Sequence, residues 1–155
     1  MKIAVIAVGK LKERFWREAA EEYAKRMTPY CDLRLIEIAD RDPARGGEER
    51  ARAEEGVDVL RALPDGARVI TLEIGGKERS SEQLAQHIES LAVGGVSSLA
   101  FVIGGSTGLS ADVLARADER MSLSAMTLPH NLARVVLLEQ LYRSFKIRRG
   151  EPYHK

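Results

Sequence analysis

The chain has very little cysteine: among its 155 residues there is one, Cys31, so an intramolecular disulfide is excluded. Neither neighbour, Tyr30 or Asp32, offers a base that would activate the thiol, and we expect a structural side chain in a reducing compartment. Long hydrophobic runs are missing too. The N-terminal run Ile3–Val8 is shorter than a signal-peptide core of about 7–15 residues and far shorter than a membrane span of about 20. These shortages predict a soluble cytoplasmic protein with no membrane partner.

Histidine is also scarce, which limits metal chemistry. His87, His130 and His154 lie far apart in the chain, and neither they nor Cys31 show the spacing of a metal site. We therefore expect no bound metal. His87 falls within a predicted helix of mixed polarity, which is typical of a surface or boundary histidine.

Charge of either sign is not in excess over the whole chain, whose net charge is only +1. The charge is unevenly placed, however: residues 134–155 hold six basic and two acidic side chains, so residues 1–133 sum to −3. Cations at a helix C-terminus, such as Lys146 and Arg148, complement the helix dipole, but a basic tail beyond the helix needs another reason. The pattern favours an anionic partner for this end of the chain.

Apolar residues recur with alternating strand and helix periods along the chain. The expected strands are residues 2–8, 33–38, 67–74 and 98–103, with a final extended stretch at 120–128 and the pair Gly75-Gly76 closing the third strand. Three of the expected helices span residues 11–27, 48–63 and 131–147. Another begins at a capping box formed by Ser80 and Gln83 and runs to Ala92, and a further one begins at the N-cap Ser110 and runs to Ala117. This order predicts one α/β domain over residues 1–155, a mainly parallel sheet flanked by helices, with its ligand site at the carboxyl ends of the strands.

The glycine turn Gly104–Gly108 follows the strand at 98–103 and permits several interpretations. A dinucleotide fingerprint is disfavoured because the glycine spacing is wrong, and about 20 residues later Ser124-Ala125-Met126 stands where an acid should grip the ribose. A tight strand-to-helix turn would need no ligand at all. Alternatively, two adjacent glycines let the backbone close on an adenosine-like ligand without obstruction by a Cβ.

The same turn also matches G-x-S-x-G, the nucleophile elbow of serine hydrolases. Ser106 would be the nucleophile, and the order Ser, Asp, His would be completed by Asp112 or Asp118 and by His130 or His154. The elbow requires a helix that begins directly after the serine, whereas the expected N-cap Ser110 delays it by several residues. A serine hydrolase is therefore a weaker alternative.

The last predicted helix is apolar over an arc wider than one core contact requires. Its apolar residues are Leu132, Val135, Val136, Leu137, Leu138, Leu141, Tyr142 and Phe145, of which Val136 points away from the rest. Soluble monomers rarely expose such a surface, so a symmetric dimer built partly on this helix is expected.

Two long stretches, FVIGGSTGLS at 101–110 and MSLSAMTLPHNLARVVLLEQLYRSFKIRRGEPYHK at 121–155, carry a family resemblance. Together with KIAVIAVGKLK, RLIEI and VITLEIGGK, they make the chain similar to the ribosomal RNA large-subunit methyltransferase H family of the SPOUT superfamily. The resemblance spans nearly the whole chain, and residues 39–60 are the least distinctive. It implies a homodimer and a deep C-terminal trefoil knot over about residues 98–155, a feature that nothing in the composition or spacing shows.

The resemblance also implies a donor and a substrate. S-adenosylmethionine would lie in the knot against Leu72, Gly104 and the consecutive residues Leu123, Ser124, Ala125, Met126, Thr127 and Leu128. The substrate would be a pseudouridine of 23S rRNA, methylated at N3 in the assembled ribosome. Leucine and methionine side chains can pack against adenine while backbone groups bond its edge.

Three residues of the basic end are the candidate catalytic residues. His154, with an ordinary pKa of about 6.5, is the best general base for the N3 proton by residue type, and Tyr153 is better suited to stacking or hydrogen bonding. Arg143 is the candidate cation inside the pocket; Arg148, Arg149 and Lys155 are further candidates for gripping phosphates. In a dimer, the tail can complete the partner's site.

His130 is expected either to contact the ligand or to hold the knot. The non-enzymatic alternative is a ribosome-associated protein that binds RNA but no donor.

Overall fold

The computed structural model describes residues 1–155, which form a five-stranded sheet in the order β2-β1-β4-β3-β5, with every pair of neighbours parallel. The strands are β1 (Lys2–Val8), β2 (Asp32–Ile38), β3 (Arg68–Glu78), β4 (Ser98–Ile103) and β5 (Glu119–Ser122). The helices are α1 (Arg14–Met27), α2 (Glu48–Ala62), α3 (Ser81–Val93), α4 (Ala111–Arg116) and α5 (His130–Arg148). The predicted fold class, a mainly parallel sheet flanked by helices, is confirmed. None of the five helices is both long and apolar enough to cross a membrane.

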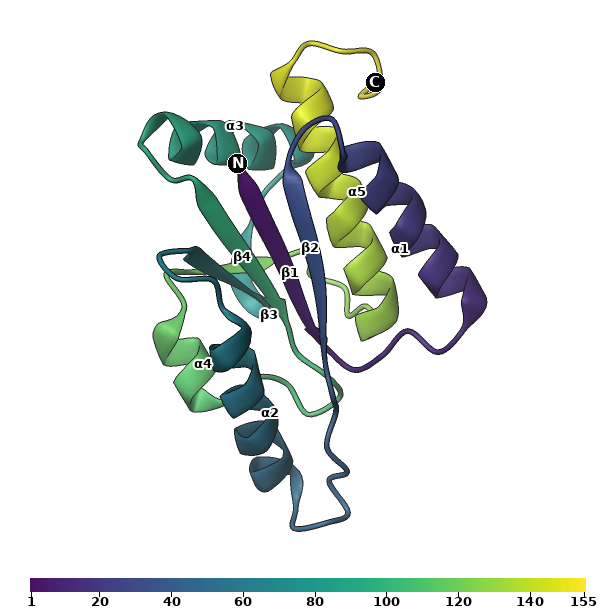
Figure 1. Ribbon diagram of the computed structural model, residues 1–155, viewed down its shortest axis with the longest axis vertical. Helices are drawn as coiled ribbons and strands as arrows, with labels where there is room; N and C mark the ends of the chain where they lie inside the picture. The colour runs from purple at the N-terminus through teal and green to yellow at the C-terminus, as the bar shows by residue number, and fades with distance from the viewer.

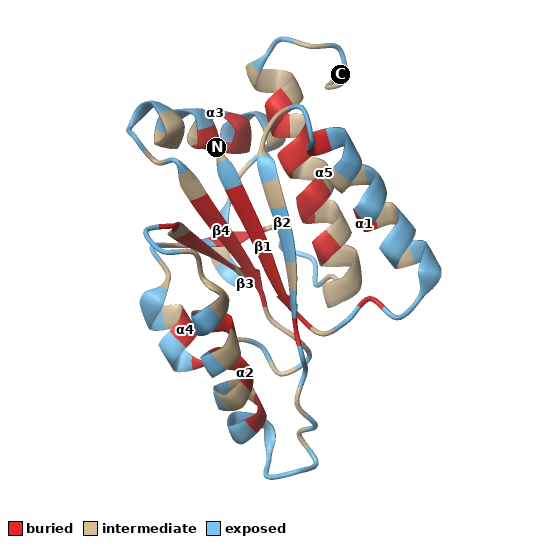
Figure 2. Cartoon of the chain, viewed as in Figure 1, coloured by how far each residue is buried: buried red, intermediate tan, exposed pale blue.

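The sheet separates two hydrophobic cores. Alternate residues of β1 point to opposite faces, so Ile3 and Val5 join a cluster of 18 buried residues, whereas Ala4 and Ile6 join one of 10. The larger cluster packs against α1, α3 and α5, and the smaller one against α2 and α4, which lie together in Figure 1. Figure 2 shows β1 and β4 coloured as buried over most of their length, with further buried residues along α5. Burial on both faces explains why these strands are apolar throughout.

The start of the first helix was predicted too early. The expected helix began at residue 11, but α1 starts at Arg14, and Leu11 lies in the preceding loop, where it is buried. The backbone N–H of Leu11 donates to the Glu37 carboxylate at 2.9 Å, a contact 26 residues away along the chain. Leu11 is apolar because the loop packs on the core. The capping box of Ser80 and Gln83 and the N-cap Ser110 are confirmed.

Two expectations around β3 and β5 were wrong. The pair Gly75-Gly76 does not close β3, which continues to Glu78 after an irregularity in its pairing with β5 between Leu72 and Lys77. The extended stretch expected at 120–128 is a strand only as far as Ser122. Beyond it, the Ser122 hydroxyl donates to the carbonyl of Ser124, and the Ser124 hydroxyl accepts from the N–H of Met126. Serine hydroxyls thus offer the backbone local partners that compete with a strand ladder.

A cluster of charges joins β5 to β3 and α3 around Glu119, whose side chain is only 12% exposed. Its carboxylate accepts from Nε of Arg68 at 2.6 Å, lies 2.6 Å from Nε2 of His87, and is 3.5 Å from Nη2 of Arg79. Burial alone would raise the pKa of Glu119, but the hydrogen bonds from Arg68 and His87 outweigh it and lower the pKa. His87 lies half-buried at this boundary, as predicted.

Replacing Glu119 by glutamine is expected to destabilise the fold by about 3 kcal/mol near neutral pH, because it leaves partly buried cations without their counter-charge. Since the pKa of Glu119 is lowered in the folded state, its contribution is present above the ordinary glutamate value of about 4.3 and is lost as the pH falls through the folded pKa. The free energies of unfolding of the wild type and Glu119→Gln, measured with urea, should therefore differ at neutral pH, and this difference should become smaller in acid. Glu78→Gln, at an exposed position of β3, is the control. A stability difference between the wild type and Glu119→Gln that does not change with pH would contradict the charge argument.

Candidate functional site

A cavity of about 390 Å³ lies where the pairing of β3 with β4 ends, at Leu72 and Ile103, the edge of the sheet at which the ligand site was predicted. Its walls come from five parts of the chain: residues 72–75, residues 103–109, Leu114 of α4, residues 122–128 and the first turn of α5. The volume suits a small organic ligand, and leucine, isoleucine and methionine side chains dominate the lining.

The glycine turn forms a tight wall of this cavity. The N–H of Gly108 donates to the carbonyl of Gly105 at 3.1 Å, and Gly108 has a φ of +80°, a conformation that favours glycine. A Cβ on Gly104 would come within 3.0 Å of the Gly108 backbone and 3.2 Å of Leu109. From α2, Arg52 donates to the carbonyl of Thr107 at 3.0 Å and holds the turn in place. A side chain at position 104 would therefore displace the wall.

Most of the predicted donor-binding residues meet at this cavity. Six of the eight line it, namely Leu72, Gly104, Leu123, Ser124, Met126 and Leu128. Ala125 and Thr127 lie between them in the sequence, but both are exposed and outside the lining. His130 also lines the cavity, which places it where it could contact a ligand. Glu73 is a lining residue that sequence reasoning missed, although it directly follows Leu72 on β3.

The three candidate catalytic residues lie together elsewhere, at the far end of α5. The guanidinium of Arg143 donates to Nδ1 of His154 at 3.1 Å and to Glu139 at 2.7 Å, and it stacks 4.7 Å from the ring centroid of Tyr153. The Tyr153 hydroxyl donates to Glu139 at 3.1 Å, and Nε2 of His154 lies 2.6 Å from Glu82. These contacts fold the tail back onto its own chain.

The same contacts set the hydrogen-bond roles in this cluster and shift the pKa values of Glu82 and Tyr153. A guanidinium has no acceptor, so Nδ1 of His154 accepts from Arg143, and Nε2 carries the proton that it donates to Glu82. The pKa of Glu82 is lowered to about 2, first by a bond to its own backbone N–H and then by His154. Burial raises the pKa of Tyr153, and the bond to Glu139 raises it further. Both ring nitrogens of His154 are thus engaged.

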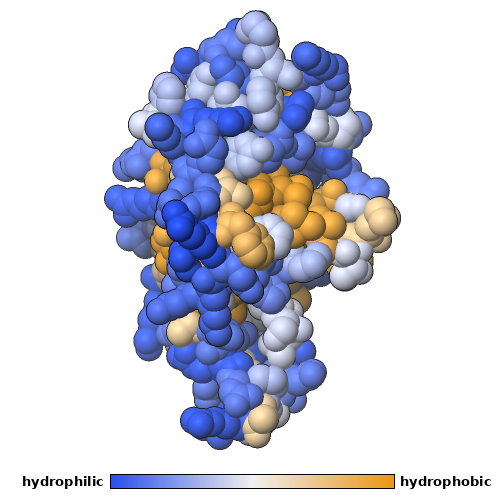
Figure 3. Space-filling model, turned by 90° about the vertical axis from the view of Figure 1, so that its right-hand side faces the viewer, coloured by the Kyte–Doolittle hydropathy of each residue, from blue (hydrophilic) through white to orange (hydrophobic).

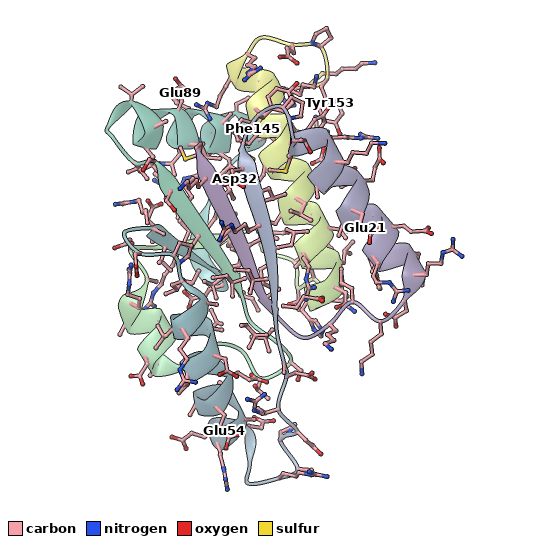
Figure 4. All side chains as sticks on the ribbon, viewed as in Figure 1. Glu21, Asp32, Glu54, Glu89, Phe145 and Tyr153 are labelled. Atoms are coloured by element: carbon pink, nitrogen blue, oxygen red, sulfur yellow. The ribbon has the colours of Figure 1, made fainter.

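The tail cluster and the cavity are separated by much of the length of α5. Arg143, which the tail contacts, lies 13 residues beyond His130 on this helix, a distance of roughly 20 Å. Its first residue, His130, lines the cavity, and the tail follows its last turn, as Figure 1 shows at the top beside the C-terminus. Figure 4 labels Tyr153 at that upper end. One chain therefore does not bring Arg143, Tyr153 or His154 to its own cavity.

Most cations of the basic end already have acidic partners. Arg134 is buried and bonds Glu37 at 2.7 Å and the carbonyl of Gly9 at 2.9 Å. The remaining pairs join Arg143 to Glu139, Lys146 to Glu151 and Arg148 to Glu89. Arg149 and Lys155 are the two cations of this end without an ion pair, so the free positive charge is smaller than the sequence indicates.

The serine-hydrolase alternative lacks its geometry in this chain. Ser106 is exposed in the glycine turn, and α4 begins only at Ala111, after the N-cap Ser110. Ser106 makes no hydrogen bond to a histidine, and both ring nitrogens of His154 are engaged by other residues. Burial raises the pKa of the Cys31 thiol to about 11, so this thiol is not an activated nucleophile. No three His, Cys, Asp or Glu side chains are grouped so that they could hold a metal ion.

Comparison with known proteins gives one consistent family. The family model described as "Predicted SPOUT methyltransferase" matches residues 1–154. Relatives from Bacillus cytotoxicus and Clostridium beijerinckii, both named "Ribosomal RNA large subunit methyltransferase H", are 47% and 46% identical over the full length of both chains. A relative of the same name from Alkaliphilus oremlandii is 47% identical, again over the full length of both chains.

Solved structures support the fold. A probable methylase family protein from Haemophilus influenzae Rd KW20 superposes with a TM-score of 0.55 at 12% identity, covering 99% of this chain and 70% of that one. TrmJ from Z. mobilis ZM4 also reaches a TM-score of 0.55, at 19% identity, covering 100% of this chain and 73% of that one. At these identities the likeness concerns the arrangement of helices and strands alone.

Proposed function

Because the chain belongs to the SPOUT methyltransferase family, we propose that it transfers a methyl group from S-adenosylmethionine to the RNA of the large ribosomal subunit. The observation that carries this proposal is the match, over the full length of both chains, to relatives named for that activity. In finer terms, we propose that the target is N3 of a pseudouridine in 23S rRNA and that the protein acts on assembled ribosomes in the cytoplasm.

The cavity fits the proposed donor. Its apolar walls at Leu72, Leu123 and Met126 suit the faces of an adenine, and backbone groups of the glycine turn and of residues 122–128 suit its edge. Gly104 lies so close to Gly108 and Leu109 that a larger residue at position 104 would push against the wall of the cavity. When bound, the donor supplies an electrophilic methyl group on a positively charged sulfur. The chain holds that group against the acceptor nitrogen and excludes water.

We also propose a homodimer, which the surface of α5 supports. Leu132, Val135 and Val136 of α5 are only half-buried in one chain and share a helix face with Arg143. Figure 3, which views the side of the molecule that carries α1 and α5, shows a hydrophobic area at mid-height surrounded by hydrophilic residues. A second copy packed on this area would bury it. It would also bring a partner's tail towards a cavity that lacks its own chain's tail.

In that dimer, the tail supplies the remaining chemistry. The N3 proton of the target must leave, and the imidazole of His154 can accept it at Nδ1 once RNA competes for the Arg143 guanidinium. Arg143 then grips a phosphate or the developing negative charge, since guanidinium forks suit phosphate oxygens. Tyr153 offers a ring for stacking on a base. Arg149 and Lys155 remain available for the RNA backbone.

Titration of the purified protein with S-adenosylmethionine tests the proposal. The wild type is expected to bind, and Gly104→Val is expected to weaken binding by about tenfold or more, because the added carbons meet Gly108 and Leu109. Ser106→Ala, an exposed change in the same turn, is the matched control and should bind and transfer labelled methyl groups to ribosomes as the wild type does. Folded wild-type protein that binds RNA without the donor would instead favour the non-enzymatic ribosome-associated protein.

A further inference from the structure

The cavity contains one acidic side chain and no lysine or arginine. Among its lining residues the only carboxylate belongs to Glu73, and the only other titratable group is the imidazole of His130. The rest of the lining is apolar side chains, glycines and two serines. Glu73 is therefore the dominant source of charge at the walls.

The carboxylate of Glu73 is held in position by one of its two oxygens. The Thr71 hydroxyl donates to Oε2 at 2.8 Å, and Nε of Arg120 lies 3.6 Å from the same atom. Oε1 has no hydrogen-bond partner in the protein. The Arg120 side chain is 57% exposed, so water screens this pair and the pair neutralises the carboxylate only in part. An oriented carboxylate thus keeps one oxygen free to meet a ligand.

A charge in this position distinguishes ligands by their own charge. S-adenosylmethionine carries a positive sulfonium, whereas the product left after methyl transfer, S-adenosylhomocysteine, has the same adenosine and amino-acid parts but a neutral sulfur. Attraction between a carboxylate and a cation is stronger in a partly enclosed apolar cavity than in water. We propose that Glu73 makes the cavity prefer the cationic donor to the neutral product, and so favours exchange of product for donor after each turnover. This inference rests on the proposed function.

The test compares both ligands on the same variants by calorimetric titration. Glu73→Gln keeps the shape and removes the charge, and it is expected to weaken S-adenosylmethionine binding by about tenfold while S-adenosylhomocysteine binding changes by less than about twofold. Glu73→Asp, which keeps the charge, should retain most of the preference. Glu78→Gln, at an exposed position of the same strand, is the control and should leave both affinities unchanged. Thermal unfolding verifies that each variant is folded.

Two outcomes would overturn the inference, and they are distinguishable. In the first outcome, the wild type binds the donor, but Glu73→Gln weakens the binding of both ligands equally or of neither. The charge preference is then wrong, and the proposed function stands. If the folded wild type binds neither ligand, the donor itself is wrong, and the role of Glu73 falls with it.

Discussion

Replacing Gly76 by alanine is expected to destabilise the protein by about 3 kcal/mol, because there is no space for a side chain at this point of β3. A Cβ on Gly76 would lie 2.5 Å from the carbonyl carbon, 2.7 Å from the nitrogen and 2.8 Å from the Cα of Met121. These are backbone atoms of β5, so the clash cannot be relieved by a rotamer change. One of the two strands must move, and the pairing that resumes at Lys77 and Met121 would be lost.

Gly75→Ala provides a matched control for this prediction. A Cβ there would meet nothing within 4 Å, so the variant should be neutral, or stabilised by up to about 1 kcal/mol through reduced freedom of the unfolded chain. Urea unfolding of the two variants, at neutral pH, measures the difference. Equal stabilities of Gly75→Ala and Gly76→Ala would show that β5 does not pack on β3 in the way described.

A mixture of two inactive variants is expected to regain activity if the tail acts in the partner's site. Gly104→Val impairs the cavity, and the double change Tyr153→Ala with His154→Ala removes the tail side chains; each alone should lower methyl transfer to ribosomes by about 100-fold or more. In a mixed dimer, an intact cavity on one chain faces an intact tail on the other. Random assortment of equal amounts would give about a quarter of the wild-type sites, half of the dimers being mixed with one good site each.

The experiment is cleanest with the two variants carrying different tags, so that mixed dimers are purified as such. Sedimentation of the wild type first establishes the dimer. The matched control is a mixture of the Gly104→Val chain with itself under a second tag, which should stay inactive. Mixed dimers that remain as inactive as their parents would place the tail at the site of its own chain, against the separation that α5 imposes.

Local patterns predicted much of the fold. The bounds of β1 and β4 agree with the sequence-based expectation to the residue, because both strands are buried on two faces and their apolar runs end where burial ends. The helix starts after Ser80 and Ser110 were also correct, since an N-cap is a contact between residues three apart. Six of the expected donor-binding positions gather at one cavity, because the strand ends that carry them share one edge of a parallel sheet.

Other features depend on contacts that no local pattern contains. Gly76 was expected to end β3, yet it lets the strand continue, because the backbone of Met121 occupies the space that a side chain at position 76 would need. Leu11 resembles a helical residue but is fixed in a loop by Glu37.

The electrostatics of the molecule were likewise decided by tertiary structure. The sequence indicated a basic end, but Arg134 is neutralised by Glu37, 97 residues away in the chain, and Arg148 by Glu89, 59 residues away. The place of Glu73 in the cavity depends on the folded arrangement of β3, β4 and the segment after β5, which the sequence does not show. The sequence by itself determined periodicity, caps and family, which depend on neighbours along the chain. Only the tertiary structure decided which charges remain free and where the tail lies relative to the cavity, because those depend on residues that folding brings together.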